Sequence, residues 1–388
     1  MVALGDVAEF VRGINFKPDD VVPVGSPETV ACMRTKNVQS SLDLSDVWAV
    51  HESFMRREDQ CLQEGDILVS SANSWNLVGK CSWIPALPYR ATFGGFVSVL
   101  RASSSKLDRR YLYRWFSSQY VQETLRSFGQ KTTNISNLNI GRCERLQLPL
   151  PPLEEQRRIA AILDQAETLR TQRRQALAHL DTLTQSLFLD MFGEQSDYPH
   201  VPLDQVCELI TDGTHYTPTY ADEGVIFLSA KNVTSGRIDW EQIKHIPESL
   251  HQELHKRVAP KLGDVLMAKN GTTGVAAIVD RDCTFDIYVS LALLRPSSKI
   301  GSVFLHAALN SPLSKKQFNA ALKGIGVPNL HLKEIRGARI PLPPLALQQI
   351  FATRIQAIEA LKATHRTALA ELDALFASLQ QRAFAGAL

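Results

Sequence analysis

Hydrophobic residues follow two different patterns along this chain of 388 residues, and the two patterns alternate. Residues 1–150 and 194–342 contain short apolar runs separated by Gly, Asn, Asp and Ser, which is typical of strands joined by turns. Within them, residues 109–128 and 303–322 have the three- and four-residue spacing of helices. Both segments therefore predict an α+β domain, a curved, strand-rich core that carries a few helices. The predicted strands include residues 66–70, 96–100 and 289–294.

Residues 151–193 and 343–388 have a long helical pattern instead. Residues 154–192 contain neither Pro nor Gly, and Pro151 and Pro152 stand where a helix would begin. Such a helix is roughly 55 Å long at about 1.5 Å per residue, too long for one small domain to cover. The heptad pattern predicts that the two helices pair as an antiparallel coiled coil with pseudo-two-fold symmetry. The apolar residues expected to pair are Ile159, Ile162, Leu169, Leu180, Leu183 and Leu187 in the first helix, and Ile355, Ile358, Leu369, Leu372 and Phe376 in the second.

Polar residues interrupt this stripe near the middle of each helix. Arg173 and His365 occupy equivalent positions, and Lys362 also breaks the second stripe. Antiparallel pairing would bring Arg173 and His365 close to the crossing point, where polar residues can fix register and partner number. The alternative is that both side chains simply point to solvent.

The two halves of the chain are copies of one unit. The same pentapeptide, Pro-Leu-Pro-Pro-Leu, occupies residues 149–153 and 341–345, and each copy closes a strand-rich segment and opens a long helix. A repeat this long indicates domain duplication, because solenoid repeats are far shorter. Two recognition modules held by a rigid spacer suit a target with two half-sites. Other matching pairs are Lys36-Asn37 with Lys231-Asn232, Gly65-Asp66 with Gly263-Asp264, and Leu100-Arg101 with Leu294-Arg295.

Composition and charge fit an ordinary globular protein. Hydrophobic residues make up 44% and charged residues 21%, and the net charge is only +2, so a nucleic-acid partner must be argued from local patches. The six cysteines have neither metal-ligand spacing nor a disulfide pattern, which favours reduced thiols. No signal-peptide pattern and no membrane-spanning apolar run is present, so we expect a cytoplasmic protein.

The residues around the first proline run resemble the specificity (S) subunit of type I restriction–modification systems. The resemblance is carried by residues 148–160 (Leu-Pro-Leu-Pro-Pro-Leu-Glu-Glu-Gln-Arg-Arg-Ile-Ala), by Met191-Phe192-Gly193, and by the polar segments 129–136 and 212–218. It covers the whole chain. It implies target recognition domain 1 at 1–150, a central spacer helix at 151–193, target recognition domain 2 at 194–342 and a C-terminal spacer helix at 343–388.

The same resemblance implies the function and the partners. A subunit of this kind is not a catalyst: it binds a bipartite, asymmetric, gapped sequence in double-stranded DNA and recruits two modification subunits. Those subunits methylate adenine with S-adenosylmethionine, and restriction subunits add ATP-driven translocation and cleavage. S-adenosylmethionine, ATP and Mg are therefore expected on partner subunits, and no cofactor is expected on this chain.

The residues themselves agree with a non-catalytic role. The chain has no Asn/Asp-Pro-Pro-Tyr/Phe motif and no Gly-x-x-x-x-Gly-Lys-Ser/Thr phosphate loop. Gly94-Gly95 leads into a predicted strand, so it favours a turn or bulge over a cofactor loop. No cluster of His, Cys or Asp has ligand spacing, so we expect no metal. Two rival functions remain, a protein-interaction scaffold built on the coiled coil and an autonomous enzyme.

Candidate DNA contacts are loops that combine base-reading residue types with phosphate-binding ones. Arg and Lys read guanine, Asn and Gln read adenine, and hydroxyls, Lys and Arg contact phosphates. In the first domain the candidates are Arg56, Arg57, Asn73, Trp75, Lys80, Lys131, Thr132, Thr133 and Asn134. In the second they are Thr214, His215, Tyr216, Thr217, Lys231, Lys269, Asn270, Thr272, Thr273 and Lys323.

Several of these residues have an alternative explanation. Arg56 and Arg57 could be a solvated surface pair, and Asn73 and Asn270 could serve turns. The Lys-Asn pair at residues 231–232 recurs at residues 36–37, so a shared turn explains it as well as DNA does. An aromatic, polar loop at residues 212–217 favours function over a mere connection.

Overall fold

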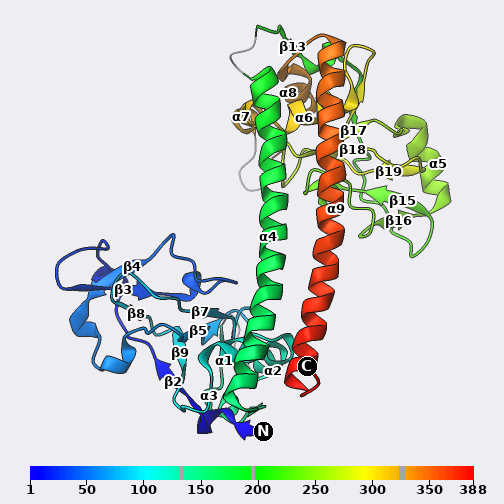
Figure 1. Cartoon of the computed structure of the whole chain (residues 1–388). Coiled ribbons are helices and arrows are strands. Elements are labelled where there is room, and N and C mark those ends of the chain that lie inside the picture. The colour runs from blue at the N-terminus through cyan, green and yellow to red at the C-terminus, as the bar shows by residue number, and fades with distance from the viewer. Residues whose placement is uncertain (129, 132–134, 194–196, 323–328) are drawn as a thin grey trace. The chain divides into compact units, whose positions relative to one another are not determined.

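The computed structural model describes residues 1–128, 130–131, 135–193, 197–322 and 329–388. These residues form two compact units, which are described separately below. Unit 1 comprises residues 1–173 and 368–388, and unit 2 comprises residues 174–367. Each unit contains one strand-rich domain and one half of each of two long helices, α4 (Leu153–Phe192) and α9 (Leu345–Phe384) (Figure 1).

Unit 1 is built on two sheets. One has the antiparallel order β2-β9-β5-β7, and the other has the order β4-β3-β8 with β3 and β8 parallel. A small sheet, β10-β11-β6, and the pair β1-β12 complete the domain. The strands are β1 (Val2–Ala3), β2 (Ala8–Arg12), β3 (Thr29–Met33), β4 (Trp48–His51), β5 (Ile67–Ser70), β6 (Ala72–Asn73), β7 (Cys81–Trp83), β8 (Ala91–Phe93), β9 (Val97–Ala102), β10 (Gln130–Lys131), β11 (Ser136–Asn137) and β12 (Gln147–Leu148).

Unit 2 repeats this plan. Its sheets have the orders β14-β20-β17-β18 and β16-β15-β19, again with a parallel pair, β15 and β19, and β13 pairs with β21. Helix α5 (Glu248–Arg257) follows β16, where unit 1 has the 3-10 turns Glu52–Phe54 and Glu58–Gln60 after β4. The strands are β13 (His200–Pro202), β14 (Cys207–Asp212), β15 (Val225–Leu228), β16 (Lys244–Ile246), β17 (Val265–Ala268), β18 (Ala276–Ile278), β19 (Phe285–Ile287), β20 (Leu291–Pro296) and β21 (Arg339–Pro341).

The predicted helical spacing at residues 109–128 and 303–322 belongs to two pairs of short helices. Ser118 has an extended backbone that ends the first helix, and Pro312 begins a new helix that Ser311 caps. The helices of these domains are α1 (Arg109–Phe116), α2 (Gln119–Ser127), α3 (Ile140–Cys143), α6 (Ser302–Asn310), α7 (Pro312–Ala321) and α8 (Leu332–Gly337).

Two of the matched sequence pairs form one buried ion pair in each unit. In unit 1, Arg101 on β9 donates to both carboxylate oxygens of Asp66, each at 2.7 Å. In unit 2, Arg295 on β20 does the same to Asp264, at 2.9 and 2.8 Å. Both carboxylates are only 2% exposed, so each needs this bidentate partner. The repeat therefore preserves the charge that is buried inside each domain.

The proline joint of unit 1 is held by the buried side chain of Gln156. Its Oε1 accepts from the backbone N–H of Asp108 at 2.8 Å, and its Nε2 donates to the carbonyls of Lys106 and Pro151 at 2.9 and 2.8 Å. Gln156 is fully buried in the first turn of α4. One amide thus ties the proline run, the start of α1 and the start of α4 together.

Gln348, at the equivalent position in the first turn of α9, makes the same three bonds in unit 2. It accepts from Gly301 N–H at 3.0 Å and donates to the carbonyls of Lys299 and Pro343 at 3.1 and 2.9 Å. It is also buried. Both joints therefore fix the direction in which the long helix leaves its domain.

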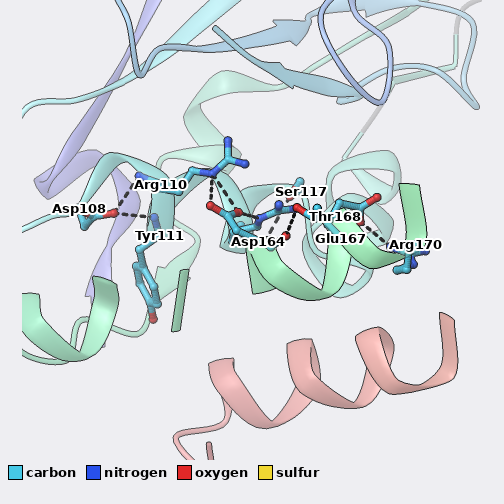
Figure 2. Close-up of polar contacts among 9 residues, drawn as sticks. Asp108, Arg110, Tyr111, Ser117, Asp164, Glu167, Thr168 and Arg170 are labelled. Atoms are coloured by element: carbon cyan, nitrogen blue, oxygen red, sulfur yellow. Dashed lines mark hydrogen bonds and ion pairs between the residues drawn. The ribbon is translucent and has the colours of Figure 1, made fainter. Parts of the chain in front are cut away.

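A second set of contacts joins α1 to α4 in unit 1 (Figure 2). Asp164 on α4 accepts from Arg110 Nε at 2.8 Å and from Arg114 Nε at 2.5 Å. Asp108 caps α1 by accepting from the backbone N–H groups of Arg110 and Tyr111, each at 2.9 Å. Arg114 is 6% exposed, so its pairing with Asp164 places a desolvated charge at this joint.

The two long helices pack together and run antiparallel. In unit 1, Arg170 Nε donates to Asp373 Oδ1 at 2.6 Å, between the first half of α4 and the second half of α9. In unit 2, Lys362 Nζ lies 2.8 Å from Asp181 Oδ1, between the second half of α4 and the first half of α9. Lys362 is 3% exposed, which confirms that a polar residue interrupts this apolar stripe.

The structure buries some residues of the expected apolar stripe and exposes others. Ile159 and Phe376 are buried in the core of unit 1, whereas Leu169 and Leu183 are 44% and 49% exposed, contrary to expectation. The polar residue that follows each leucine contacts α9 instead. Arg170 contacts α9 in unit 1, and Thr184 accepts from Lys362 Nζ at 3.2 Å in unit 2. Polar contacts at these positions displace the leucines outward. The other expected residues that are half-buried are Ile162, Arg173, Leu180, Leu187, Ile355, Ile358, His365, Leu369 and Leu372.

None of the helices in the described part of the chain is both long enough and apolar enough to cross a membrane.

Candidate nucleic-acid interface

In unit 2, three of the predicted segments meet around the turn between β19 and β20. Val289 N–H donates to the Thr214 carbonyl at 2.9 Å, and Lys269 N–H donates to the Ser290 carbonyl at 2.9 Å. Ala230 N–H donates to Ser290 Oγ at 3.0 Å. The turn Tyr288–Ser290 therefore brings together the loops that carry Thr214, Lys231 and Lys269, which are far apart in the sequence.

A buried carboxylate organises this edge. Asp212, at the end of β14, is 4% exposed and lies 2.7 Å from Lys269 Nζ, 3.1 Å from Arg257 Nη2 and 3.4 Å from His215 Nε2. Burial opposes ionisation of Asp212, but Lys269 and then His215 outweigh it and hold its pKa below the ordinary value. Lys269 is 6% exposed, so its ammonium holds the loop and is not presented to solvent.

Glycine is required directly after Asp212. A Cβ on Gly213 would collide with the carbonyl of Ile287, because the end of β14 crosses close over the end of β19. Gly13 of unit 1 has the same close contact with Gly94. The backbone geometry of this edge is therefore shared by the two domains.

Tyrosine side chains are exposed in the 212–220 segment of unit 2. Tyr216 is 85% exposed, and Thr217 Oγ1 lies 3.2 Å from the hydroxyl of Tyr288. Lys244 Nζ lies 3.7 Å from the centre of the Tyr220 ring. A cation over an aromatic ring and an exposed tyrosine are both groups suited to an anionic, stacked polymer.

The two residues of the Lys-Asn pair at 231–232 differ in environment: the asparagine is buried and the lysine is exposed. Asn232 is 6% exposed, accepts from Ser229 N–H at 2.9 Å and donates to two backbone carbonyls. Asn37 makes the same contacts in unit 1. The asparagine therefore serves a shared turn, as the alternative explanation held. Lys231 is exposed beside it and stays a candidate for a phosphate contact.

Asn270 lies where two loops touch. It forms an isolated bridge with Asn329, and Leu330 N–H donates to the Lys269 carbonyl at 2.8 Å. Thr272 is exposed and Thr273 is half-exposed in the turn that follows. The structure thus places Asn270, Thr272 and Thr273 on one short segment. Lys323 lies outside the described residues.

In unit 1 the corresponding edge is a small sheet. Its order is β10-β11-β6, with Ser136 opposite Asn73 and Lys131 opposite Ser136. Ala72 N–H donates to the Phe96 carbonyl at 3.1 Å, so this sheet joins the turn between β8 and β9. The structure therefore unites the Asn73 loop with the strand of Lys131. Thr132, Thr133 and Asn134 lie outside the described residues.

Other candidates of unit 1 differ in their availability. Asn73 is engaged with its own turn, accepting from Ser74 N–H at 2.8 Å and donating to Ser70 Oγ at 3.1 Å. Trp75 is 46% exposed on the following turn. Lys80 is half-buried and donates to Gln39 Oε1 at 2.5 Å.

The arginine pair lies elsewhere. Arg56 and Arg57 precede the 3-10 turn Glu58–Gln60, and Arg57 Nε lies 3.1 Å from Asp59 Oδ1. Both side chains are exposed. Among the described residues, no hydrogen bond or ion pair connects them to β6 or to the Phe96 turn. They therefore stay a separate candidate.

Phe96 is a surface residue that the sequence reasoning missed. It is 64% exposed at the tip of the turn between β8 and β9, the position that Ser290 occupies in unit 2. The turn itself was predicted correctly at Gly94-Gly95. The available signal was a large apolar residue directly after two glycines, where a connection needs no hydrophobic side chain.

A cluster of metal-binding residue types was also missed. His251 and His255 on α5 and Asp286 on β19 lie together, with candidate ligand atoms within 4.8 Å of one another. The histidines are four residues apart on one helix face, which is the signal that the sequence contained.

Two strand-rich domains, each joined to halves of the same two long helices, define a protein built from a duplicated module. The chain matches the family described as "Type I restriction modification DNA specificity domain" over residues 1–179 and 195–374. It belongs to that family, so it is a specificity subunit, the non-catalytic subunit that determines DNA target recognition. The resemblance seen in the sequence is confirmed.

Relatives with known roles cover most of the chain. It is 27% identical to the type I restriction enzyme MjaVIII specificity subunit of Methanocaldococcus jannaschii, over 69% of each protein. It is 21% identical to the EcoKI specificity subunit of Escherichia coli, over 98% of this chain and 87% of that one.

Among solved structures, the S subunit of a type I system from M. genitalium matches with a TM-score of 0.57 at 15% identity, over 99% of this chain and 95% of that one. A chain from a study of complex assembly and conformational transition of the type I R-M system matches with a TM-score of 0.58 at 19% identity, over 100% and 97%. These structures show the fold, two domains and two long helices.

Proposed function

We propose that each unit reads one half of a bipartite, asymmetric, gapped sequence in double-stranded DNA. The chain also recruits two adenine-methylating modification subunits and the restriction subunits of a type I complex. S-adenosylmethionine, ATP and Mg then act on those partner subunits, and this chain supplies specificity alone. The domain boundaries given from the sequence describe the two readers and their spacer helices.

The observation that carries this proposal is a shared framework with different edges. The ion pairs Asp66–Arg101 and Asp264–Arg295 are the same in both domains, as are the Gln156 and Gln348 joints. Residues at equivalent points of the two edges differ. Two similar frameworks with different edges would bind two different half-sites, so the whole target would be asymmetric.

The two domains differ at two pairs of equivalent residues on their edges. Phe96 in unit 1 stands where unit 2 has Ser290. The Phe96 carbonyl accepts from Ser71 N–H, and the Ser290 carbonyl accepts from Lys269 N–H. Ala72 pairs with Asn137, whereas Asn270 pairs with Asn329. An amide in place of a methyl group changes what a base edge can bond to, because asparagine can make a bidentate contact with adenine.

The chemistry of unit 2 also suits a phosphate backbone. Lys231 and Lys244 are exposed cations of unit 2, and Tyr216 and Thr217 are exposed residues with hydroxyl groups. Such groups make the contacts that set register on a duplex, while loop residues such as Asn270 select bases. Assembly with other subunits is supported by the solved relative whose title concerns complex assembly of the type I R-M system.

A gel shift with the purified chain, with and without modification subunits, tests the proposal. The probe is a plasmid-derived fragment containing a methylated motif of the host, and a scrambled fragment is the competitor. Tyr216→Ala should weaken binding about fivefold, the loss expected of one hydrogen bond of about 1 kcal/mol. Tyr120→Ala is the matched control, because Tyr120 is a 75% exposed tyrosine on α2 and belongs to none of the candidate loops.

Sequence-selective binding that Tyr216→Ala weakens and Tyr120→Ala leaves intact supports the proposal. No selective binding in either condition contradicts it, and would favour a scaffold that binds only proteins.

A further inference from the structure

The fold of unit 2 places an acidic side chain beside two histidines. His251 Nδ1 lies 2.7 Å from Asp286 Oδ2, and His255 Nδ1 lies 3.3 Å from Asp286 Oδ1. The two imidazole rings are 4.7 Å apart between centroids. Both rings therefore turn the same nitrogen toward one carboxylate.

Local structure explains the convergence. Phe285 and Ile287 on β19 point into the core of unit 2, so the alternation of a strand turns Asp286 to the opposite face. Helix α5 lies on that face, and its His251 and His255 share one side because they are one helical turn apart. The cluster is thus fixed by a strand and a helix, which hold ligands more rigidly than loops.

The charge on Asp286 needs a counter-charge. Its side chain is 2% exposed, and among the described residues no lysine or arginine lies within ion-pair distance of it. A buried carboxylate is costly unless a cation or a protonated imidazole accompanies it. Asp66, Asp212 and Asp264, the other buried aspartates with ion pairs, all have lysine or arginine partners. Of these four buried aspartates, Asp286 is the one whose ion-pair partners are histidines instead of lysine or arginine.

Two imidazoles and a carboxylate are the ligands of a borderline divalent metal ion. Zn²⁺ binds His nitrogen at about 2.0–2.1 Å and Asp oxygen at about 2.0–2.2 Å, so two ligand atoms on one tetrahedral ion are about 3.4 Å apart. The three candidate atoms lie within 4.8 Å of one another, so side-chain shifts of under about 1 Å would close the site. Mg²⁺ and Ca²⁺ prefer oxygen ligands and would bind poorly here.

Thiols compete weakly for such an ion. Burial raises the pKa of Cys32, Cys81, Cys143 and Cys207 to about 12, so these groups stay protonated at neutral pH. Among the described residues, the histidine cluster is therefore a better site for the ion than these four thiols.

The cluster is joined to the edge by two short links. Arg257, the last residue of α5, donates to Asp212 Oδ1 at 3.1 Å and to the Gly213 carbonyl at 3.3 Å. Ile287, next to Asp286, accepts from Thr214 N–H at 3.1 Å. An ion that clamps α5 to β19 would thus also fix both supports of the 212–217 loop.

We propose that His251, His255 and Asp286 form a binding site for one Zn²⁺-class transition-metal ion, which clamps α5 onto β19 and rigidifies the 212–217 loop. The ion has three protein ligands, and water completes its coordination. Its role is structural. The site is independent of what DNA the chain reads.

The test uses the purified full chain, stripped of metal with a chelator and returned to chelator-free buffer. Co²⁺ is titrated as a spectroscopic probe, and bound Zn²⁺ is counted by mass spectrometry after dialysis. We expect one equivalent at this site, and at Zn²⁺ a hundred times its Kd the unfolding temperature of unit 2 should rise by about 5 to 10 °C. Mg²⁺ at the same concentration should give no shift.

Three variants decide the assignment. His255→Ala and Asp286→Asn should each lose one equivalent of Zn²⁺ and the thermal shift, and the one-third-exposed His255 makes its variant the safer one to fold. His215→Ala is the matched control, because His215 also lies beside a buried aspartate, Asp212, but forms no three-ligand cluster among the described residues. Retention of the full stoichiometry in His255→Ala, or no Zn²⁺-dependent difference between the unaltered chain and His255→Ala, would overturn the proposal.

Discussion

Arg170 of α4 and Asp373 of α9 are joined by a 2.6 Å hydrogen bond from Nε to Oδ1, and the same guanidinium lies 4.3 Å from the centre of the Phe376 ring. In unit 2, Asp181 and Lys362 make the corresponding contact at 2.8 Å. Asp181 is eleven residues after Arg170, and Lys362 is eleven residues before Asp373, so both contacts belong to one antiparallel register. Polar pairs therefore mark the register of the two helices.

A double-mutant cycle on Arg170→Ala and Asp373→Ala should give a coupling energy of about 0.5–1 kcal/mol. The value is modest because Asp373 is 44% exposed and water screens the pair. Chemical unfolding of the four proteins measures it. The exposed pair of Arg90 and Glu58, which lies outside both long helices, is the control cycle. Strictly additive effects of Arg170→Ala and Asp373→Ala would show that the pair does not define register.

Gln156→Ala should lower the free energy of unfolding of unit 1 by about 2–3 kcal/mol, because it leaves buried backbone groups at the joint unpaired. Gln348→Ala should do the same to unit 2. Hydrogen exchange separates the two: α1 should lose protection in the first variant and α6 in the second. Gln119→Ala is the control, since Gln119 is exposed and donates to Glu123 within its own helix. Equal protection in all three variants would mean that the glutamines do not hold the joints.

Much of the fold could be predicted from the sequence because the relevant signals are local or repeated. The doubled Pro-Leu-Pro-Pro-Leu marks both joints, and the long uninterrupted heptads give α4 and α9. The repeated Gly-Asp and Leu-Arg pairs pointed to a shared framework. Their meaning was missed, because only the structure shows that Asp66 and Arg101 are partners across 35 residues of chain.

Other features depend on tertiary contacts that no local pattern shows. Leu169 and Leu183 fit the apolar stripe, yet contacts between polar residues on α4 and α9 turn them outward. Lys269 was a candidate DNA contact because its loop combines lysine, asparagine and hydroxyl residues, but its buried ammonium pairs with Asp212, 57 residues away in the sequence. Phe96 was passed over because a single apolar residue in a turn gives no periodic signal.

The charge network at Asp212 predicts a pH dependence. The pKa of Asp212 is lowered in the folded chain, so its contribution to stability is fully present above its unfolded pKa of about 3.9 and is lost as the pH falls through the folded value. At pH 7, Asp212→Asn should cost about 3–5 kcal/mol, because Lys269 is left as a buried, unpaired charge.

The difference between the unaltered chain and Asp212→Asn should be constant from about pH 5 to 7 and shrink below about pH 4. Urea unfolding at a series of pH values, with hydrogen exchange in β14 and β17 as the probe of unit 2, measures it. Asp222→Asn, at an exposed loop position of the same unit, should show no such trend. A constant difference down to about pH 2 would contradict the assigned pKa direction.

Two substitutions at the candidate edges should have different signatures. Lys131→Ala should weaken DNA binding by a similar factor on all sequences and reduce the salt slope by about 1, as the loss of one phosphate contact does. Binding titrations over a range of salt concentrations measure both effects. A slope that is unchanged would remove Lys131 from the phosphate contacts.

Asn270→Ala should instead relax specificity in one half-site, by about 1–3 kcal/mol at one base pair. Binding to a library in which each half-site is randomised in turn shows where the loss falls. Ser235→Ala is the control, because Ser235 is a polar residue on another exposed turn of unit 2. An unaltered motif in Asn270→Ala would exclude direct reading by that side chain.

The central claim, that each unit reads its own half of a gapped target, is tested most directly by single-molecule sequencing of methylated adenines. The host DNA is compared between cells carrying this chain and cells in which residues 197–341 are replaced by the second domain of a relative. The account predicts an asymmetric motif with a non-specific gap, of which the exchange changes one half and leaves the other. A continuous motif, or an exchange that alters both halves, would contradict it.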